Sequence, residues 1–275
     1  MKSTLRHGIV LAALGVLLLT PMLASAGEVY ALNLRTTSGV KLFSFDPADP
    51  TVQTIIKDPI DYPTYAMDFN SAATMLYAIK NVSTSSWELG SIDPLTGDYT
   101  TVAPVSGLST APSGLSVDPT DETFYVSTGT DLYTMDPATG VVTSVAPFVG
   151  VGGELTIDIA IDASGQMYGH DIGNDGLYSI DKATGVMTFI GGHGLTANYA
   201  QGMDFDYETG TLYATIYTGG GTGKFVSWDT STGEITVLAD TSTWNMEMEM
   251  AVRSAIPEPA SFVLLALAGI VLRRR

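Results

Sequence analysis

The chain has 275 residues, with 29 acidic against 12 basic side chains, a net charge of −17 and no cysteine. The charge excludes binding of nucleic acid or anionic lipid through a basic surface, because such a chain repels polyanions. The lack of cysteine excludes disulfides, thiol catalysis and cysteine metal sites.

Residues 1–26 have the three parts of a secretory signal peptide. Lys2 and Arg6 are positive, Ile9 to Leu19 is apolar, and Ala24-Ser25-Ala26 is a small-residue cleavage site. The apolar run is too short and wrongly flanked for a permanent membrane span. We therefore expect export and removal of this segment. The remaining body, residues 27–255, carries seven basic and 28 acidic side chains.

Two short phrases recur through the body with one period. The first is Asp-Pro-x-Thr-Gly or a variant of it, beginning at Asp46, Asp93, Asp136, Asp181 and Asp229. The second is a residue pair that ends in tyrosine, at Tyr30, Tyr77, Tyr125, Tyr168 and Tyr213. Successive copies lie 43 to 48 residues apart. This period, combined with strand-like content, is typical of a β-propeller blade.

Each repeat divides into four runs rich in β-branched and aromatic residues. In one unit the predicted strands are Gly114 to Val117, Thr123 to Thr128, Asp131 to Met135 and Val141 to Ala146. No sustained helical period occurs between the two ends of the chain. The predicted fold class is therefore all-β.

The recurring residues of both phrases can be explained by the local structures that they favour. In the first, the Asp side chain can accept backbone N–H bonds and the glycine can take the left-handed conformation that closes a hairpin. Turns between first and second strands are led in the same way by Asp118, Asp162 and Asp206, with Asn70 in an earlier copy. We expect the tyrosine of the second phrase to pack between neighbouring blades.

The ends of the body predict a closed ring. Glu28 to Leu32 has the pattern of a second strand, whereas Met248 to Val252 has that of a first strand. The last strand should therefore complete the blade formed by the first three, which removes exposed sheet edges. The count predicts a β-propeller of five four-stranded blades, and six blades are the alternative if one unit is divergent.

The body from Glu28 to Arg253 resembles the loose group of secreted bacterial propellers with NHL-like or YVTN-like repeats. The phrases Leu-Tyr-Ala and Asp-Pro-x-Thr-Gly carry this resemblance. It implies the propeller fold. Because the group includes binding proteins, lyases and oxidoreductases, it implies no single activity.

His170 and His193 are the candidate general bases, since a propeller lyase or hydrolase needs one. By repeat position His170 follows a second strand and His193 follows a fourth. We therefore expect no pairing between them, and a loop or surface position for each.

Asp171, Asn174 and Asp175 form a loop whose oxygens could hold calcium, the one cofactor that the sequence suggests. The EF-hand pattern fails here, because Gly173 takes the third position and Lys182 replaces the bidentate glutamate. A polar hairpin turn is the favoured interpretation, with no metal.

Acids inside the first strands are a further candidate. Asp68 and Asp204 occupy one repeat position, where the other copies have Ser116, Ala160 and Ala251. Acids near the axis could line a cation-binding channel mouth, with Glu247 and Glu249 close by. Hydrogen bonding to backbone amides is the alternative.

Residues 256–275 consist of Pro257-Glu258-Pro259, an apolar run, and Arg273-Arg274-Arg275. In this order they resemble the PEP-CTERM sorting signal of Gram-negative bacteria. The resemblance implies cleavage near Pro-Glu-Pro by an exosortase-type membrane protease. Before cleavage, a short transmembrane helix would hold the chain in the inner membrane, with its arginines in the cytoplasm. Afterwards the product would reach the cell surface or the extracellular matrix. A C-terminal anchor that is never processed is the alternative.

These observations favour a non-catalytic surface or matrix propeller that binds exopolysaccharide or surface proteins, rather than nucleic acid. The alternative is an extracellular lyase or hydrolase that acts on polysaccharide through a central acidic pocket.

Overall fold

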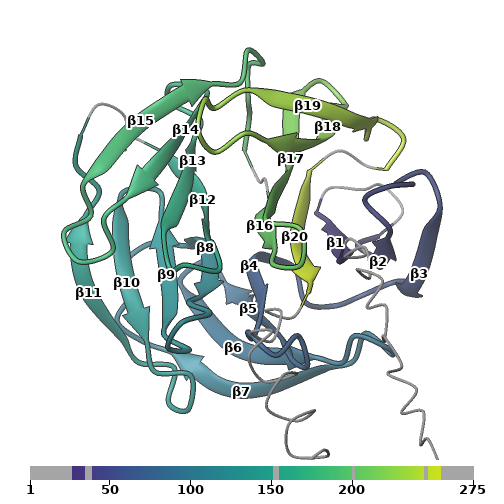
Figure 1. Cartoon of the computed structure of the whole chain (residues 1–275). Helices are drawn as coiled ribbons and strands as arrows, with labels where there is room; N and C mark the ends of the chain where they lie inside the picture. Colours follow the sequence, from purple (N-terminus) through teal and green to yellow (C-terminus); the bar gives the residue numbers. More distant parts are fainter. Residues whose placement is uncertain (1–26, 35–38, 151–154, 200–201, 245–246, 255–275) are drawn as a thin grey trace, which may run out of the picture.

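The computed structural model describes residues 27–34, 39–150, 155–199, 202–244 and 247–254. The predicted signal peptide and the predicted sorting signal lie outside these residues. Five four-stranded antiparallel sheets surround a central axis (Figure 1). A search of the described part of the chain found no helix with the length and apolarity to cross a membrane.

In every blade the strands follow one another from the axis outward. Blade 1 contains β20 (Met248–Arg253), β1 (Glu28–Asn33), β2 (Leu42–Phe45) and β3 (Gln53–Lys57). Blade 2 contains β4 (Thr64–Phe69), β5 (Leu76–Ser83), β6 (Ser86–Ile92) and β7 (Tyr99–Val105).

The other three blades follow the same order. Blade 3 contains β8 (Pro112–Val117), β9 (Phe124–Thr128), β10 (Asp131–Met135) and β11 (Val142–Pro147). Blade 4 contains β12 (Thr156–Ile161), β13 (Met167–Asp171), β14 (Gly176–Ile180) and β15 (Met187–Gly192). Blade 5 contains β16 (Met203–Asp206), β17 (Thr211–Gly219), β18 (Thr222–Trp228) and β19 (Ile235–Asp240).

Blade 1 closes the ring by joining the two ends of the body. β20 pairs with β1 in register, with Val252 opposite Val29 and Ala251 opposite Tyr30 (Figure 1). The predicted closure and the count of five blades are therefore confirmed. Each terminal strand satisfies the ladder hydrogen bonds of the other, so neither remains an exposed edge.

The strands differ in burial according to their distance from the axis. Every position of β12 and β16 is buried, whereas β19 on the periphery alternates between intermediate and exposed. The third and fourth strands of every blade also pair with a register shift. Such a bulge increases strand twist, as blades that pack face to face around an axis require.

The turn phrases behave as predicted. The side chain of Asp136 accepts the N–H of Ala138, and Gly140 closes the turn with a φ of 70°. A Cβ at Gly140 would also overlap the carbonyl of Pro104 in the preceding blade. The glycine is therefore required both by its conformation and by the close approach of two blades.

The repeat tyrosines pack between blades, as expected. Tyr30 meets Phe69 of blade 2 with ring centroids 5.3 Å apart, and Tyr77 meets Phe124 of blade 3 at 4.9 Å. Both pairs are edge-to-face, which is a favoured geometry for aromatic rings.

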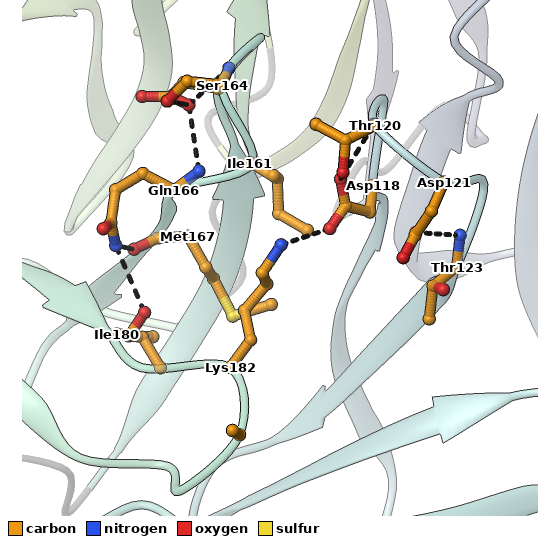
Figure 2. Close-up of polar contacts among 12 residues, drawn as sticks. Asp118, Thr120, Asp121, Thr123, Ile161, Ser164, Gln166, Met167, Ile180 and Lys182 are labelled. Carbon is orange, nitrogen blue, oxygen red and sulfur yellow. Dashed lines mark hydrogen bonds and ion pairs between the residues drawn. The ribbon is translucent and has the colours of Figure 1, made fainter.

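One copy of the turn phrase links two blades by charge. Lys182, which stands where three other copies have proline, reaches the buried carboxylate of Asp118 in the turn between β8 and β9 (Figure 2). Thr120 donates to the same carboxylate through its N–H and its hydroxyl. Burial raises the pKa of Asp118, but these hydrogen bonds outweigh it and the net pKa is lowered.

Candidate functional site

The inner strands place equivalent residues at two levels along the axis. At the level of the repeat tyrosines stand Asp68, Ser116, Ala160, Asp204 and Ala251. Two residues earlier in each repeat, on the inner strand or just before it, stand Ala66, Gly114, Asp158, Gly202 and Glu249. The repeat register predicted from the sequence is therefore correct.

Three of the acids at these levels connect neighbouring blades. Asp68 accepts the N–H of Phe69 at 2.6 Å and that of Val117 in blade 3 at 2.7 Å. In the same way Asp204 accepts the amide of Phe205 at 2.7 Å and that of Val252 in blade 1 at 2.6 Å. Hydrogen bonding to backbone amides, the alternative considered for Asp68 and Asp204, is thus confirmed.

Asp158 makes the third such connection. Its carboxylate accepts the amide of Ile159 at 2.8 Å and that of Met203 in blade 5 at 2.6 Å. Gly114 provides space for this group, because a Cβ there would overlap Asp158 Oδ1. The sequence pattern singled out Asp68 and Asp204 and missed Asp158. The sequence did contain a signal for Asp158, because Asp158 and Glu249 share one repeat position and two copies therefore have an acid there.

Burial controls the protonation of these acids. It raises the pKa of Asp204 to about 7, against hydrogen bonds from the amides of Val252 and Phe205 that lower it. Burial also raises the pKa of Asp68, Asp158 and Glu249 well above that of an ordinary carboxyl group, and neighbouring carboxylates add to each shift. These groups therefore hold protons at a pH where surface carboxylates have lost theirs.

A cavity of about 330 Å³ lies where the inner strands begin. Residues from four inner strands or the segments just before them line it, so it forms one mouth of the central channel. Its walls are apolar and aromatic, with Tyr65, Leu155, Ile157 and Tyr199 among the lining residues. Glu247 and Glu249 also line it and are buried. We call this cavity the channel-mouth pocket.

The structure contradicts the expectation that the two histidines are unpaired and that His170 lies in a loop, whereas His193 follows the fourth strand β15 as predicted. His170 lies within β13, both rings are buried, and their Nε2 atoms are 3.2 Å apart. The edges of both rings also meet the indole of Trp228. The N–H of His193 donates to the carbonyl of Asp175, which extends the pairing of β15 with β14 by one residue beyond Gly192. His193 thus lies in the same blade as His170, two strands away, and repeat position alone did not reveal that the two side chains meet across β14.

The tautomers of the pair follow from its neighbours. Nδ1 of His193 accepts the N–H of Leu195 at 3.3 Å, so its proton is on Nε2 and is donated to His170. Burial lowers the pKa of His170, and His193 adds to the shift. Burial also lowers the pKa of His193, with Asp175 opposing. Neither ring lines the channel-mouth pocket.

The candidate calcium loop is a turn between β13 and β14. The carboxylate of Asp171 accepts the amides of Leu155 and Asn174, and Asp175 accepts that of Ala197 at 2.7 Å. Two of these carboxylate oxygens are therefore directed at chain segments outside the loop. The loop is therefore the connection of the β13–β14 hairpin, and it also anchors the segment that carries His193.

The fold and this cavity define the protein as a five-bladed β-propeller with an acidic pocket at one channel mouth. Residues 59–243 match the family described as a repeat of unknown function, DUF6923, and the chain belongs to that family. No curated protein matches the sequence.

Solved structures agree with the fold. The chain is similar to one in a nidogen/laminin complex, with 11% identity and a TM-score of 0.53 over 82% of this chain and 98% of that one. It is also similar to a Bacteroides thetaiotaomicron protein of unknown function, with 15% identity and a TM-score of 0.54, covering 76% of this chain and 55% of the other. The chain thus spans about half the length of that second protein. At such identities the likeness shows the fold alone.

Proposed function

We propose that the protein is an exported, non-catalytic binding module that holds its partner at the channel-mouth pocket. The observation that carries this proposal is the cavity of about 330 Å³ with an aromatic rim. Tyr199 is 59% exposed on that rim, and Tyr65 is partly buried beside it. A preformed concave site with apolar walls and few polar groups is typical of ligand sites in proteins.

The test is a binding screen of the purified protein on glycan arrays and on the exopolysaccharide and surface proteins of the producing cell. Binding should be lost in Tyr199→Ala and kept in Tyr199→Phe, because the ring face supplies the contact. Leu95→Ala is the matched control, since Leu95 is exposed on a turn outside the pocket. Binding that survives Tyr199→Ala together with Tyr65→Ala would place the partner elsewhere.

The same proposal includes sorting by an exosortase-type protease. It is supported by the resemblance of Pro257-Glu258-Pro259 and the terminal arginines to the PEP-CTERM signal, and by the end of β20 at Arg253, before this segment. Pro257→Ala combined with Glu258→Ala should retain the protein in the inner membrane. Normal release of that variant in a fractionation experiment would disprove the assignment.

The alternative is a polysaccharide lyase or hydrolase that uses the central acidic pocket. One observation favours it: the pKa of Glu249 is raised by burial, as in a carboxyl group that serves as a general acid. His170 and His193 lie outside the pocket, which removes their support for this mechanism. Shortening of the producing cell's polysaccharide by the wild type, but not by Glu249→Gln, would favour the enzyme.

A further inference from the structure

Glu249 occupies in blade 1 the position that Asp158 occupies in blade 4. The equivalent backbone amides for Glu249 are those of Met250 on its own strand and Met67 in blade 2. Both are near enough to lower its pKa, yet neither Oε atom of Glu249 accepts a hydrogen bond of normal geometry. Glutamate is one methylene longer than aspartate. We attribute the difference to this extra length, which carries the carboxylate past the two amides.

The displaced carboxylate belongs to the lining of the channel-mouth pocket. Glu249 is only 1% exposed, so it is a buried acid that faces a cavity without a well-formed hydrogen bond. Burial of such a group is costly unless a partner compensates it. Aspartate would avoid this cost, as Asp158 shows. The longer side chain of Glu249 thus costs stability relative to aspartate, but it places a carboxylate where a ligand in the pocket can contact it.

The surroundings of Glu249 are uniformly acidic. Asp68 on β4 and Asp204 on β16, in the two adjacent blades, and Asp158 on β12 are its acidic neighbours, and Glu247 lies just before its strand. On β1 the residue opposite Glu249 is the apolar Leu32, and the acidic Glu28 pairs at the other end of the strand with Arg253. None of the described residues that line the pocket is basic. A carboxylate that ionises in this pocket therefore finds no cationic partner among the lining residues, and a bound cation would favour its ionised form.

The walls indicate which kind of cation fits. A hard metal ion such as calcium takes six to eight oxygen ligands. The lining provides instead two carboxylates among Tyr65, Leu155, Ile157 and other largely carbon surfaces. The hydroxyl of Ser113, also in the lining, is already bonded to the carbonyl of Thr156 at 2.9 Å. Tyrosine faces attract organic ammonium groups through their negative π surface.

We propose that the channel-mouth pocket binds a small organic ammonium ion. Glu249 faces its charged nitrogen, and Tyr65 and Tyr199 contact its carbon portion. The inference rests on the binding function proposed above and adds the chemical class of the ligand.

The experiment is a calorimetric titration of the purified protein at pH 8 with benzylammonium chloride, and with benzyl alcohol as its neutral counterpart. Benzylammonium should bind, and benzyl alcohol should bind at least tenfold more weakly. Glu249→Gln and Glu249→Asp should each lower the affinity at least tenfold. Glu249→Asp should also melt at or above the wild-type temperature, because the shorter side chain can accept both amides. A purely structural Glu249 predicts the reverse, with affinity unchanged and stability lost.

Further outcomes distinguish a failure of ammonium binding from a failure of the proposed binding function. Glu249-dependent binding of calcium chloride without binding of benzylammonium would overturn the inference in favour of a metal site. Absence of ammonium binding, with Tyr199-dependent partner binding retained, would overturn the inference and leave the binding function intact. Absence of ammonium binding together with absence of Tyr199-dependent partner binding would overturn the ammonium site and the binding function.

Discussion

Nε2 of His193 donates a hydrogen bond to Nε2 of His170, 3.2 Å away, against the indole of Trp228. The pair requires both rings to be neutral, since protonation of His170 removes the acceptor and places a charge in a buried site. Two residues of blade 4 that are 23 positions apart thus form a bond that is sensitive to pH, and both rings pack against Trp228 of blade 5.

We predict that this pair makes stability fall in mild acid. Both pKa values are lowered in the folded state, so the unfolded chain binds more protons once the pH falls below about 6.5. The stabilisation is complete above that pH and decreases by up to about 1.4 kcal/mol per unit and per histidine below it. Urea unfolding between pH 7.5 and 5 measures the slope.

The control for this experiment is His170→Gln combined with His193→Gln, which cannot titrate. Raised carboxylate pKa values act in the opposite direction and remain in both proteins, so the difference between the two profiles isolates the histidines. Parallel profiles would show that the pair does not control acid stability.

Asp204 should give the opposite pH dependence. Its pKa rises to about 7 in the folded state, so folding favours its protonated form. Its contribution to stability is complete below the ordinary carboxyl pKa of about 4 and is lost as the pH rises towards 7. Relative to Asp204→Asn, the wild type should therefore lose about 1.4 kcal/mol per pH unit across this window. Urea unfolding of both proteins at four pH values measures it, and a constant difference would refute the prediction.

The ion pair between Lys182 and Asp118 should contribute to stability. Lys182→Met keeps most of the side-chain volume but leaves the Asp118 side chain, which is 1% exposed, without its cation. We expect a loss of about 2–3 kcal/mol in the free energy of unfolding. Adding Asp118→Asn should recover part of it, which a double-mutant cycle measures.

Lys57→Met is the matched control for Lys182→Met. Its partner Asp98 has a side chain 70% exposed, so this loss should stay below about 1 kcal/mol. Equal losses at the two sites would mean that burial of Asp118 has no influence.

Gly114→Ala tests the space reserved for Asp158. The new methyl group would overlap Asp158 Oδ1 and approach Ser127 Oγ to 2.8 Å. We expect destabilisation of about 1–3 kcal/mol in thermal or urea unfolding. Gly192→Ala is the control, because its nearest neighbour is at 3.5 Å. Adding Asp158→Ala to Gly114→Ala should relieve the overlap, and failure to do so would assign the cost to another contact.

We expect the domain to require β20, the strand that closes the ring, in order to fold. A chain that ends after Glu247 lacks β20, which exposes the edge of β1 and removes the Val252 amide from Asp204. We expect no cooperative thermal transition for it. A chain that ends after Ser254 retains β20 and should melt at the wild-type temperature. Cooperative unfolding of the shorter chain would show that the ring tolerates an open blade.

The sequence alone determined the register of the inner strands and the closure of the ring, and it predicted five blades with six as the alternative. These properties are local and periodic: each turn aspartate, left-handed glycine and repeat tyrosine acts within one blade or against the next, so the pattern repeats in the sequence. It also placed Asp68 and Asp204 correctly on their strands.

Only the tertiary structure decided which side chains meet. His193 reaches His170 across β14, because its backbone extends the β15–β14 pairing by one residue, and repeat position alone does not encode that side-chain contact. Likewise, Asp158 and Glu249 share one repeat position, yet one accepts two amides and the other lines a cavity. The outcome depends on whether one additional methylene carries the carboxylate past two backbone amides, one of which belongs to the next blade. The distance between the two blades is set by tertiary packing and is not encoded in the repeat pattern.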